Sequence, residues 1–307
     1  MSIVAEAPGF LQVLSNGDVK RLVHQTVDSS TNISNEYKFK DVTIDPSKPI
    51  TARIFLPSTN SKPLPQLPVL VYFHGGGFCI GTTTWLGYHV FLGNLSSTAK
   101  AIVLSIDYRL APENKLPVAY DDCFAALEWL GSSSEPWLER ADLTRVFLSG
   151  DSAGGNIAHQ VVIRYGKTNI PKVGIKGLLP IHPFFGSTTR TKLELADGSS
   201  DEVAMNDMFW KLSLPDGTDR DYYGCNFEKG DGATEWRRFP AVMVFVAGLD
   251  FLKERGVMYV EFLKKKGVKS VSLVEAEDEM HVFHAWNPES EATCLLQKQI
   301  GSFIQSL

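Results

Sequence analysis

The chain has 307 residues, of which 44% are hydrophobic and 21% are charged. This composition is ordinary for a globular protein and excludes a disordered chain, a collagen-like chain and a coiled-coil rod. The 30 basic and 35 acidic side chains leave a net charge of −5, which argues against nucleic acid or an anionic membrane as the main partner.

The sequence predicts no membrane span and no signal peptide. Its longest mostly apolar stretch, Pro68 to Ile80, is interrupted by His74 and by glycines and is too short to cross a bilayer. The first residues lack a basic region followed by a long apolar run, so we expect no signal peptide. The four cysteines stand far apart without a Cys-x-x-Cys pair, which favours reduced thiols, no metal site and a cytoplasmic protein.

The first predicted element is a short β-hairpin. Its strands, Leu11–Leu14 and Val19–Val23, are joined by Ser15-Asn16-Gly17-Asp18, and Asn-Gly between two apolar runs is typical of a tight hairpin turn. A polar stretch over residues 28–38 then separates this piece from the main body of the chain.

From Lys40 onward, strand and helix patterns alternate. The predicted strands are Ala52–Leu56, Val69–His74, Ala101–Ile106, Arg145–Ser149, Ile175–Ile181, Ala241–Ala247 and Ser270–Glu275. The predicted helices are Gly87–Thr98, Ala119–Leu130, Gly154–Tyr165, Asp201–Leu214, Lys253–Lys266 and Ser290–Gln305. Apolar strands alternating with helices are typical of a mostly parallel sheet covered on both faces. The segment from Gly186 to Trp236 interrupts this alternation, and an insertion of that length is usually a lid or a binding element.

The segment Gly150-Asp151-Ser152-Ala153-Gly154 fits the Gly-x-Ser-x-Gly pattern of a nucleophile elbow. A predicted strand ends just before it and a predicted helix begins just after it, which is the context that the motif requires. Small residues are needed because the chain turns sharply there and holds the serine hydroxyl above the sheet. We therefore predict that Ser152 is a nucleophile and that the N–H of Ala153 donates to an oxyanion. A glycine-rich turn that only packs or binds phosphate is the alternative.

A second glycine-rich segment, His74-Gly75-Gly76-Gly77-Phe78, directly follows a predicted apolar strand. Consecutive glycines let the backbone lie against a ligand and point its N–H groups toward it. We predict that Gly75 and Gly76 complete the oxyanion hole with Ala153, and that His74 orders the loop rather than acting as a base. No Lys-Ser or Lys-Thr pair follows the glycines, which disfavours a phosphate-binding loop.

A serine nucleophile needs a base, and the base needs a carboxylate that orients it. Where the nucleophile stands in a Gly-x-Ser-x-Gly elbow, the chain order is Ser, then Asp or Glu, then His. Asp250 and His281 each come shortly after one of the last two predicted strands. We predict Asp250 as the carboxylate and His281 as the base. His284 is the rival base; if it is not the base, we expect it at the mouth of the substrate pocket.

With these residues in place, the sequence resembles the plant carboxylesterases of the hormone-sensitive-lipase group, an α/β-hydrolase family that also includes the gibberellin receptors. The motifs that carry the resemblance are His74-Gly75-Gly76-Gly77-Phe78, Asp107-Tyr108-Arg109-Leu110-Ala111-Pro112-Glu113, Gly150-Asp151-Ser152-Ala153-Gly154-Gly155-Asn156 and Phe209-Trp210-Lys211-Leu212-Ser213-Leu214-Pro215. The resemblance covers nearly the whole chain. It implies a single α/β-hydrolase domain over residues 1–307, with a mostly parallel eight-stranded sheet flanked by helices. A cap would be made from residues 1–39 and from the insertion 186–236 after the sixth strand.

These residues predict a serine carboxylesterase that hydrolyses a small, relatively apolar ester through an acyl-enzyme, without a metal or an organic cofactor. Candidate pocket residues are Phe78, Ile80, Trp85, Met205, Phe209 and Trp210. The first alternative is non-hydrolytic use of the same site, by a cyclase, a dehydratase or lyase, or a transesterifying enzyme. The second is a hormone receptor, which is less favoured because the gibberellin receptors lack the catalytic histidine and this chain has His281. The expected partner is a small molecule, and the oligomeric state stays open.

Overall fold

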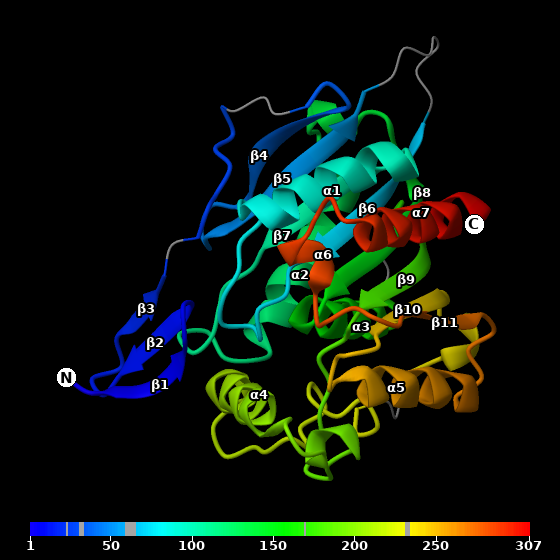
Figure 1. The fold of residues 1–307 in the computed structure, drawn as a ribbon. Coiled ribbons are helices and arrows are strands. Elements are labelled where there is room, and N and C mark those ends of the chain that lie inside the picture. Colours follow the sequence, from blue (N-terminus) through cyan, green and yellow to red (C-terminus); the bar gives the residue numbers. More distant parts are fainter. Residues whose placement is uncertain (23, 31–33, 59–65, 169, 231–233) are drawn as a thin grey trace.

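The computed structural model describes residues 1–22, 24–30, 34–58, 66–168, 170–230 and 234–307. A central sheet dominates it. Its strands are β4 (Tyr37–Asp45), β5 (Ile50–Pro57), β6 (Leu67–Phe73), β7 (Ile102–Asp107), β8 (Ala141–Asp151), β9 (Ile175–Ile181), β10 (Ala241–Ala247) and β11 (Val271–Ala276). They lie in the order β11-β10-β9-β8-β6-β7-β5-β4, with antiparallel pairing only in β4–β5 and β5–β7 (Figure 1). The sheet is therefore mostly parallel and eight-stranded, as the sequence predicts.

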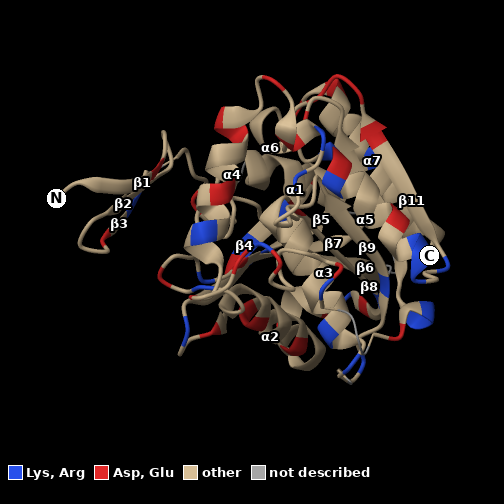
Figure 2. Cartoon of the chain, turned by 90° about the horizontal axis from the view of Figure 1, so that it is seen from below, with Lys and Arg blue, Asp and Glu red and all other residues tan. Residues whose placement is uncertain are grey.

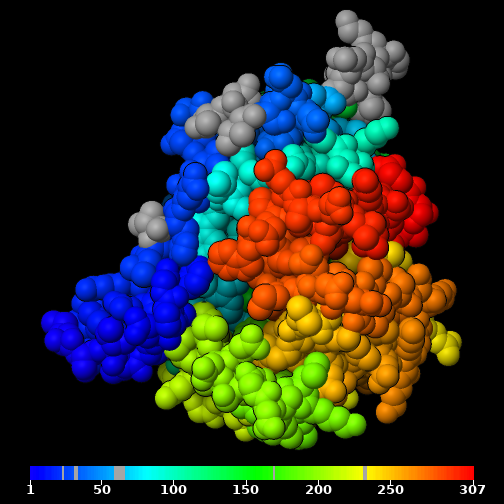
Figure 3. Space-filling model, in the orientation of Figure 1, coloured from blue at the N-terminus to red at the C-terminus, as the bar shows by residue number. Residues whose placement is uncertain are grey.

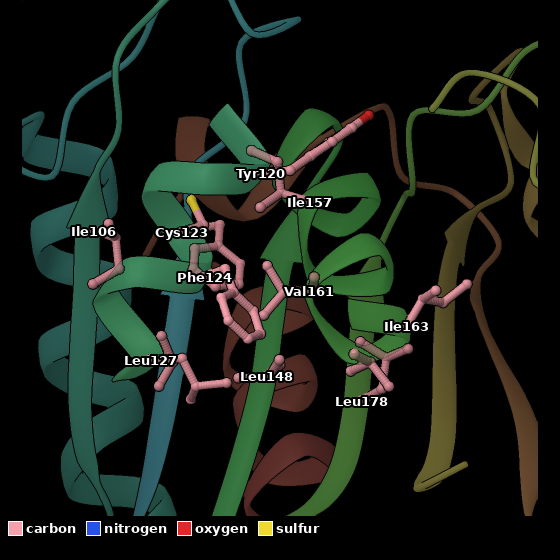
Figure 4. Packing of buried hydrophobic residues seen from close by; sticks show 14 of the residues in the cluster. Ile106, Tyr120, Cys123, Phe124, Leu127, Leu148, Ile157, Val161, Ile163 and Leu178 are labelled. Carbon is pink, nitrogen blue, oxygen red and sulfur yellow. The ribbon is translucent and has the colours of Figure 1, made fainter. Parts of the chain in front are cut away.

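Helices cover both faces of this sheet. The helices α1 (Leu86–Ala99) and α7 (Glu291–Ser306) pack on one face, and α2 (Val118–Ser132), α3 (Ala153–Tyr165) and α5 (Lys253–Lys265) pack on the other. Successive strand residues point to opposite faces. Accordingly, Val71 of β6 is buried with α2 and α3, whereas Tyr72 is buried with α1 and α7. Figure 4 shows this packing where Phe124 of α2 and Val161 of α3 meet above Leu148 of β8.

The structure contains each strand and helix predicted from Lys40 onward, with ends that differ by a few residues. It adds the edge strand β4, a short helix α6 (Phe283–Trp286) and the single turns η1 (Pro136–Leu138), η2 (Leu193–Leu195) and η3 (Trp236–Arg238). Strand β4 was not predicted because it begins inside a polar stretch and alternates buried and exposed residues. Its pairing with β5 supplies the order that its own sequence does not indicate.

The N-terminal segment forms a small separate sheet from β1 (Ile3–Ala7), β2 (Leu11–Leu14) and β3 (Val19–Arg21). The strands β2 and β3 pair as the predicted hairpin; Val23, at its predicted end, lies outside the described residues. The insertion after β9 contains α4 (Ser200–Ser213). Leu11 of the small sheet packs in one apolar cluster with Ile80, which follows β6, and with Phe209 of α4. In Figure 3 the N-terminal segment, the insertion and the chain around α6 meet on one face of the molecule.

Parallel strands place their carboxyl ends at the same edge of a sheet. The glycine loop follows β6, the elbow follows β8, and the predicted carboxylate and base follow β10 and β11. The sheet order thus brings together segments that are up to about two hundred residues apart in sequence. Within the described part of the chain, no helix is long and apolar enough to cross a membrane.

Candidate active site

Ser152 stands at a sharp turn between β8 and α3. Its backbone has φ +51° and ψ −118°, a conformation that non-glycine residues rarely adopt. The flanking glycines make this turn possible, because a Cβ on Gly150 would lie 2.4 Å from the Gly154 carbonyl carbon and one on Gly154 would lie 1.8 Å from the Phe73 oxygen. The turn holds the Ser152 side chain at the carboxyl edge of the sheet, where it lines a cavity.

The structure brings Ser152, His281 and Asp250 into one hydrogen-bonded row. Nε2 of His281 lies 3.0 Å from the Ser152 Oγ, and Nδ1 of His281 lies 2.6 Å from Oδ2 of Asp250. The other carboxylate oxygen of Asp250 accepts the backbone N–H of Leu252 at 2.8 Å. An ionised Asp250 can only accept, so Nδ1 carries the imidazole proton and Nε2 is left to accept from the serine hydroxyl.

The charges of this row support that arrangement. Burial opposes the ionised form of Asp250, but the imidazole beside it and the Leu252 N–H outweigh burial and lower the pKa of the carboxyl group. Burial likewise opposes a charged His281, yet the charge and hydrogen bond of Asp250 outweigh it and raise the pKa of the imidazole above 6.5. The pair therefore stabilises an imidazolium, which is the species that forms when a histidine takes a serine proton.

A further histidine, His182, holds the backbone next to His281 in place. Its Nδ1 accepts the backbone N–H of Val282 at 2.9 Å, next to His281, and burial lowers its pKa well below 6.5. Donor atoms of His182, Asp250 and His281 lie within 4.8 Å of one another, a spacing that a cation can use. The hydrogen bonds to Ser152 and Val282 already engage both imidazoles, so the cluster fits the serine site better than a metal site.

The glycine loop corrects one predicted donor. The N–H of Gly75 donates to Oδ1 of Asp151 and to the hydroxyl of Tyr88, both at 3.0 Å, so it is not available to an oxyanion. Gly76 and Gly77 line the cavity instead, with φ +103° and +57°. Among the described residues, no hydrogen bond engages the N–H of either glycine. The prediction of Gly75 is therefore wrong, and Gly76 and Gly77 are the glycines of this loop that line the cavity.

Asp151 and His74 fix this loop. Asp151 is fully buried and accepts hydrogen bonds from the hydroxyl groups of Tyr72 and Tyr88, at 2.7 and 2.8 Å. Burial raises the pKa of its carboxyl group. His74 is 1% exposed, stacks on Tyr108 and has its Nδ1 2.8 Å from the Gly75 carbonyl. It thus occupies the ordering position that the sequence predicts for it, away from the cavity lining.

Above Ser152 lies a cavity of about 420 Å³, within the usual range for a small-molecule site. Four of the predicted pocket residues line it, namely Ile80, Trp85, Met205 and Phe209. Phe78 and Trp210 do not; they are 1% and 0% exposed and pack together beneath the loop, where Trp210 also stacks on Phe184. Large aromatic residues suit a core and a pocket equally, so their type alone cannot separate the two.

His284 is also misplaced by the sequence prediction. It is fully buried in α6, its Nε2 lies 3.3 Å from the Tyr72 hydroxyl, and its ring packs against Phe91. Burial lowers its pKa to about 3. His284 therefore lies in the core, not at the pocket mouth, and no hydrogen bond within the described chain joins it to Ser152.

The lining also contains residues that the sequence prediction missed: Ala7, Phe10, His24, Gln25, Leu86, Gly87, Tyr88, Asp151, Phe184, Glu202, Asn206, Phe251, Leu252, Val282, Ala285 and Trp286. Two of them, Glu202 and Asn206, share the face of α4 that carries Met205 and Phe209. Helical spacing from those predicted residues would have found both. The residues of the N-terminal segment had no comparable signal, because their position depends on how the small sheet docks.

Comparison with known proteins agrees with this architecture. Residues 70–285 match a family described as alpha/beta hydrolase fold. Probable carboxylesterase 6 of Arabidopsis thaliana is 39% identical over 231 residues, which are 73% of this chain and 69% of that protein. Tuliposide A-converting enzyme 1, chloroplastic, of Tulipa gesneriana is 37% identical over 311 residues, which are 99% of this chain and 78% of that protein. Probable carboxylesterase 4, mitochondrial, of Arabidopsis thaliana is 37% identical over 98% of this chain and 83% of its own length.

Solved esterases share the fold as well. An esterase of Pyrobaculum calidifontis superposes with a TM-score of 0.74 at 27% identity, over 88% of this chain and 85% of its own. A thermostable carboxylesterase cloned from a metagenomic library gives 0.76 at 27% identity, over 88% of each chain. Since the family match spans most of the chain and relatives named carboxylesterases align with it, this protein belongs to the α/β-hydrolase family, in its plant carboxylesterase group, and is a carboxylic ester hydrolase.

Proposed function

We propose that this protein hydrolyses a small, relatively apolar ester through an acyl-enzyme on Ser152. The observation that carries the proposal is the row Ser152–His281–Asp250, with contacts of 3.0 and 2.6 Å, beside a cavity whose lining is mostly apolar. His281 is the base and Asp250 orients it, in the roles that a hydrolytic triad requires.

In the first half of the reaction His281 takes the proton of the Ser152 hydroxyl, and the serine oxygen attacks the ester carbonyl carbon. The carbonyl oxygen becomes an oxyanion and accepts the N–H groups of Gly76, Gly77 and Ala153. Each such donor typically stabilises the transition state by about 3–4 kcal/mol. His281 then gives its proton to the departing alcohol, which leaves the acyl group on Ser152.

In the second half water replaces the alcohol. His281 takes a proton from the water, the hydroxide attacks the acyl carbon, and the acid leaves as Ser152 regains its proton. If another hydroxyl group takes the place of water, the same acyl-enzyme gives transesterification or ring closure. The relatives named tuliposide A-converting enzymes are the reason to keep this second outcome as the alternative. Product analysis separates the two, because only hydrolysis releases the free acid.

The remaining assignments are also proposals. Residues 1–39 and 186–236 form a cap on one catalytic domain, in keeping with the cavity lining that both contribute. A reducing compartment suits the free thiols of the described chain, of which only Cys294 is exposed. We assign the cytoplasm, although some relatives are named chloroplastic, amyloplastic or mitochondrial. No metal or cofactor takes part.

Replacement of the two reacting side chains tests the mechanism. Ser152→Ala and His281→Ala should each lower kcat for an aryl ester by about 10³-fold or more, with little change in folding. Ser152→Ala should also abolish labelling by a fluorophosphonate. Ser149→Ala is the matched control, because Ser149 lies on the strand that leads into Ser152 and its hydroxyl donates to the Leu179 carbonyl, away from the cavity lining.

Two results would contradict the assignment. If His284→Ala stops turnover while His281→Ala does not, the base is wrong. If Ser152→Ala still converts a substrate that the unaltered protein converts, the reaction does not pass through an acyl-serine, and a lyase or cyclase mechanism takes its place.

A further inference from the structure

Asn206 is a buried residue on the wall of the cavity. It is 5% exposed, and no group in the described part of the chain forms a hydrogen bond with its buried Oδ1 atom. It lies on the face of α4 that also presents Glu202, Met205 and Phe209 to the cavity. Ser152 lines the same cavity, so the amide borders the space in which an ester reacts.

The other buried asparagines of the described chain show how such side chains are normally held. Oδ1 of Asn156 accepts a hydrogen bond from the Tyr120 hydroxyl at 2.8 Å, and Oδ1 of Asn226 accepts one from the Glu228 N–H at 3.0 Å. Buried polar groups in folded proteins are nearly always paired, because an unpaired one destabilises the fold. Other buried polar atoms of the described chain, such as Ser105 Oγ and Trp210 Nε1, also lack a partner, but Asn206 lines the cavity, where a ligand can supply one.

We propose that Asn206 binds a hydroxyl group of the substrate, and that the substrate is a neutral, hydroxylated ester. This inference rests on the ester hydrolysis proposed above and narrows its substrate class. A hydroxyl can both donate to the amide oxygen and accept from the amide nitrogen. An ester that lacks the hydroxyl displaces water from the cavity and leaves the amide buried and unpaired, which weakens the bound transition state.

The charge of the lining favours a neutral molecule over an anion. The described residues that line the cavity include no lysine or arginine. Glu202, one helical turn before Asn206, repels an anionic group. The lining holds a second polar atom without a hydrogen-bond partner in the described chain, the buried Nε2 of His24. Such polar groups in a mostly apolar lining suit a hydroxylated molecule better than a plain hydrocarbon ester.

Matched esters test the inference. The first series consists of aryl esters of straight-chain acids, compared with the same esters that carry one hydroxyl group at successive positions of the acyl chain. The second series consists of the acetates of cyclohexanol and of hydroxylated cyclohexanols. With the unaltered protein, at least one hydroxylated ester should exceed its deoxy partner in kcat/KM by about tenfold or more. In Asn206→Leu this ratio should fall to about one, while Tm stays equal or rises because an unpaired polar group is gone.

Met205→Leu is the control, since it changes the shape of the same wall without touching a polar group, and it should keep the ratio. A hydroxyl preference that survives in Asn206→Leu overturns the inference, as does hydrolysis of all the esters without any such preference. A fall in Tm in Asn206→Leu, with both members of a pair lost equally, assigns Asn206 to the fold and overturns it too. Failure of the unaltered, folded protein to hydrolyse any ester instead removes the proposed function itself.

Discussion

The ionisation of His281 sets the conditions under which the proposed reaction runs. The imidazole must be neutral to take the Ser152 proton, and it also has to hold the charge that it then acquires. Asp250 serves both needs, because its carboxylate fixes the Nδ1–H tautomer and raises the pKa of His281 above 6.5 despite the opposing effect of burial. Activity and stability therefore depend on this one group in opposite ways.

We expect kcat/KM for a neutral ester to fall on the acidic side with a midpoint above pH 6.5, where His281 becomes protonated. Asp250→Asn should move that midpoint to lower pH and reduce kcat by about 10³- to 10⁴-fold, since the amide no longer stabilises the imidazolium. Rates measured between pH 5 and 9 check both effects. If the midpoint of the acidic limb is the same in Asp250→Asn as in the unaltered protein, Asp250 does not set the pKa of the group that titrates.

The sign for stability is the reverse. Because the pKa of His281 is higher in the folded than in the unfolded chain, its contribution is fully present below about pH 6.5 and is lost as the pH rises through the folded value. Asp250 has a lowered pKa, so its contribution is present above its unfolded value of about 3.9 and disappears in acid. The pair is thus most stabilising in a mildly acidic range, where His281 is already protonated and cannot act as the base.

At the scale of single residues, the sequence predicts those whose type and order the reaction chemistry dictates. Ser152, Asp250 and His281 are restricted by residue type, motif and chain order, and the structure places them in contact. The choice between Gly75 and Gly77 depends on a single N–H that Asp151 and Tyr88 bind, and nothing in three consecutive glycines indicates which one those groups will reach.

Helix α4 is the element that gives the cavity its chemical character. It presents Met205 and Phe209 as apolar wall, Asn206 as an unpaired amide and Glu202 as an acidic group at its first turn. Acidic positions along α4 are visible in Figure 2. Asp201, beside Glu202 in the same turn, does not line the cavity. The two carboxylates therefore form a matched pair for a test of charge selection.

We expect Glu202→Gln to raise kcat/KM for an ester with an anionic substituent, relative to its neutral analogue, by about three- to tenfold at low salt. Asp201→Asn removes the same charge from the same helix turn, so the loss of helix-dipole stabilisation is shared. It should leave the ratio almost unchanged. Because Glu202 also helps to raise the pKa of His281, Glu202→Gln should move the acidic limb slightly downward. Equal ratios in both variants would mean that charge acts only at long range.

Sequence patterns predict α4 itself but miss two elements that depend on tertiary contacts, β4 and α6. A run such as Asp201–Leu214 has helical spacing that needs no tertiary information. Strand β4 has no such independence, since it starts in a polar stretch and is ordered by pairing with β5 and by packing of Tyr37 and Phe39 against α1. The short helix α6 likewise depends on the left-handed backbone conformation of Val282 and on the burial of Phe283. No local sequence pattern predicts either feature.

At the scale of the whole molecule, segments far apart in the sequence together form the wall of the cavity. The N-terminal segment supplies Phe10 and His24 to the lining, although its strands form a sheet separate from the one that leads into Ser152. Arg21 fastens this segment to the main body. It donates to the carbonyls of Cys79 and Ala111, at 2.7 and 2.8 Å, and pairs with Glu113. Cys79 lies just beyond the glycine loop, so the attachment reaches close to the proposed oxyanion donors.

We expect Arg21→Met to lower kcat/KM by about tenfold, mainly through a higher KM, because the N-terminal segment no longer holds its side of the cavity. The core sheet does not depend on this contact, so the main thermal transition should shift little. Lys20→Met is the control, since Lys20 is the exposed neighbour of Arg21 on β3 and takes no part in the attachment. Limited proteolysis checks the cause: cleavage between β3 and β4 should accelerate in Arg21→Met alone. Equal behaviour of the two variants would show that the segment is held by its apolar contacts, with Arg21 adding nothing that catalysis requires.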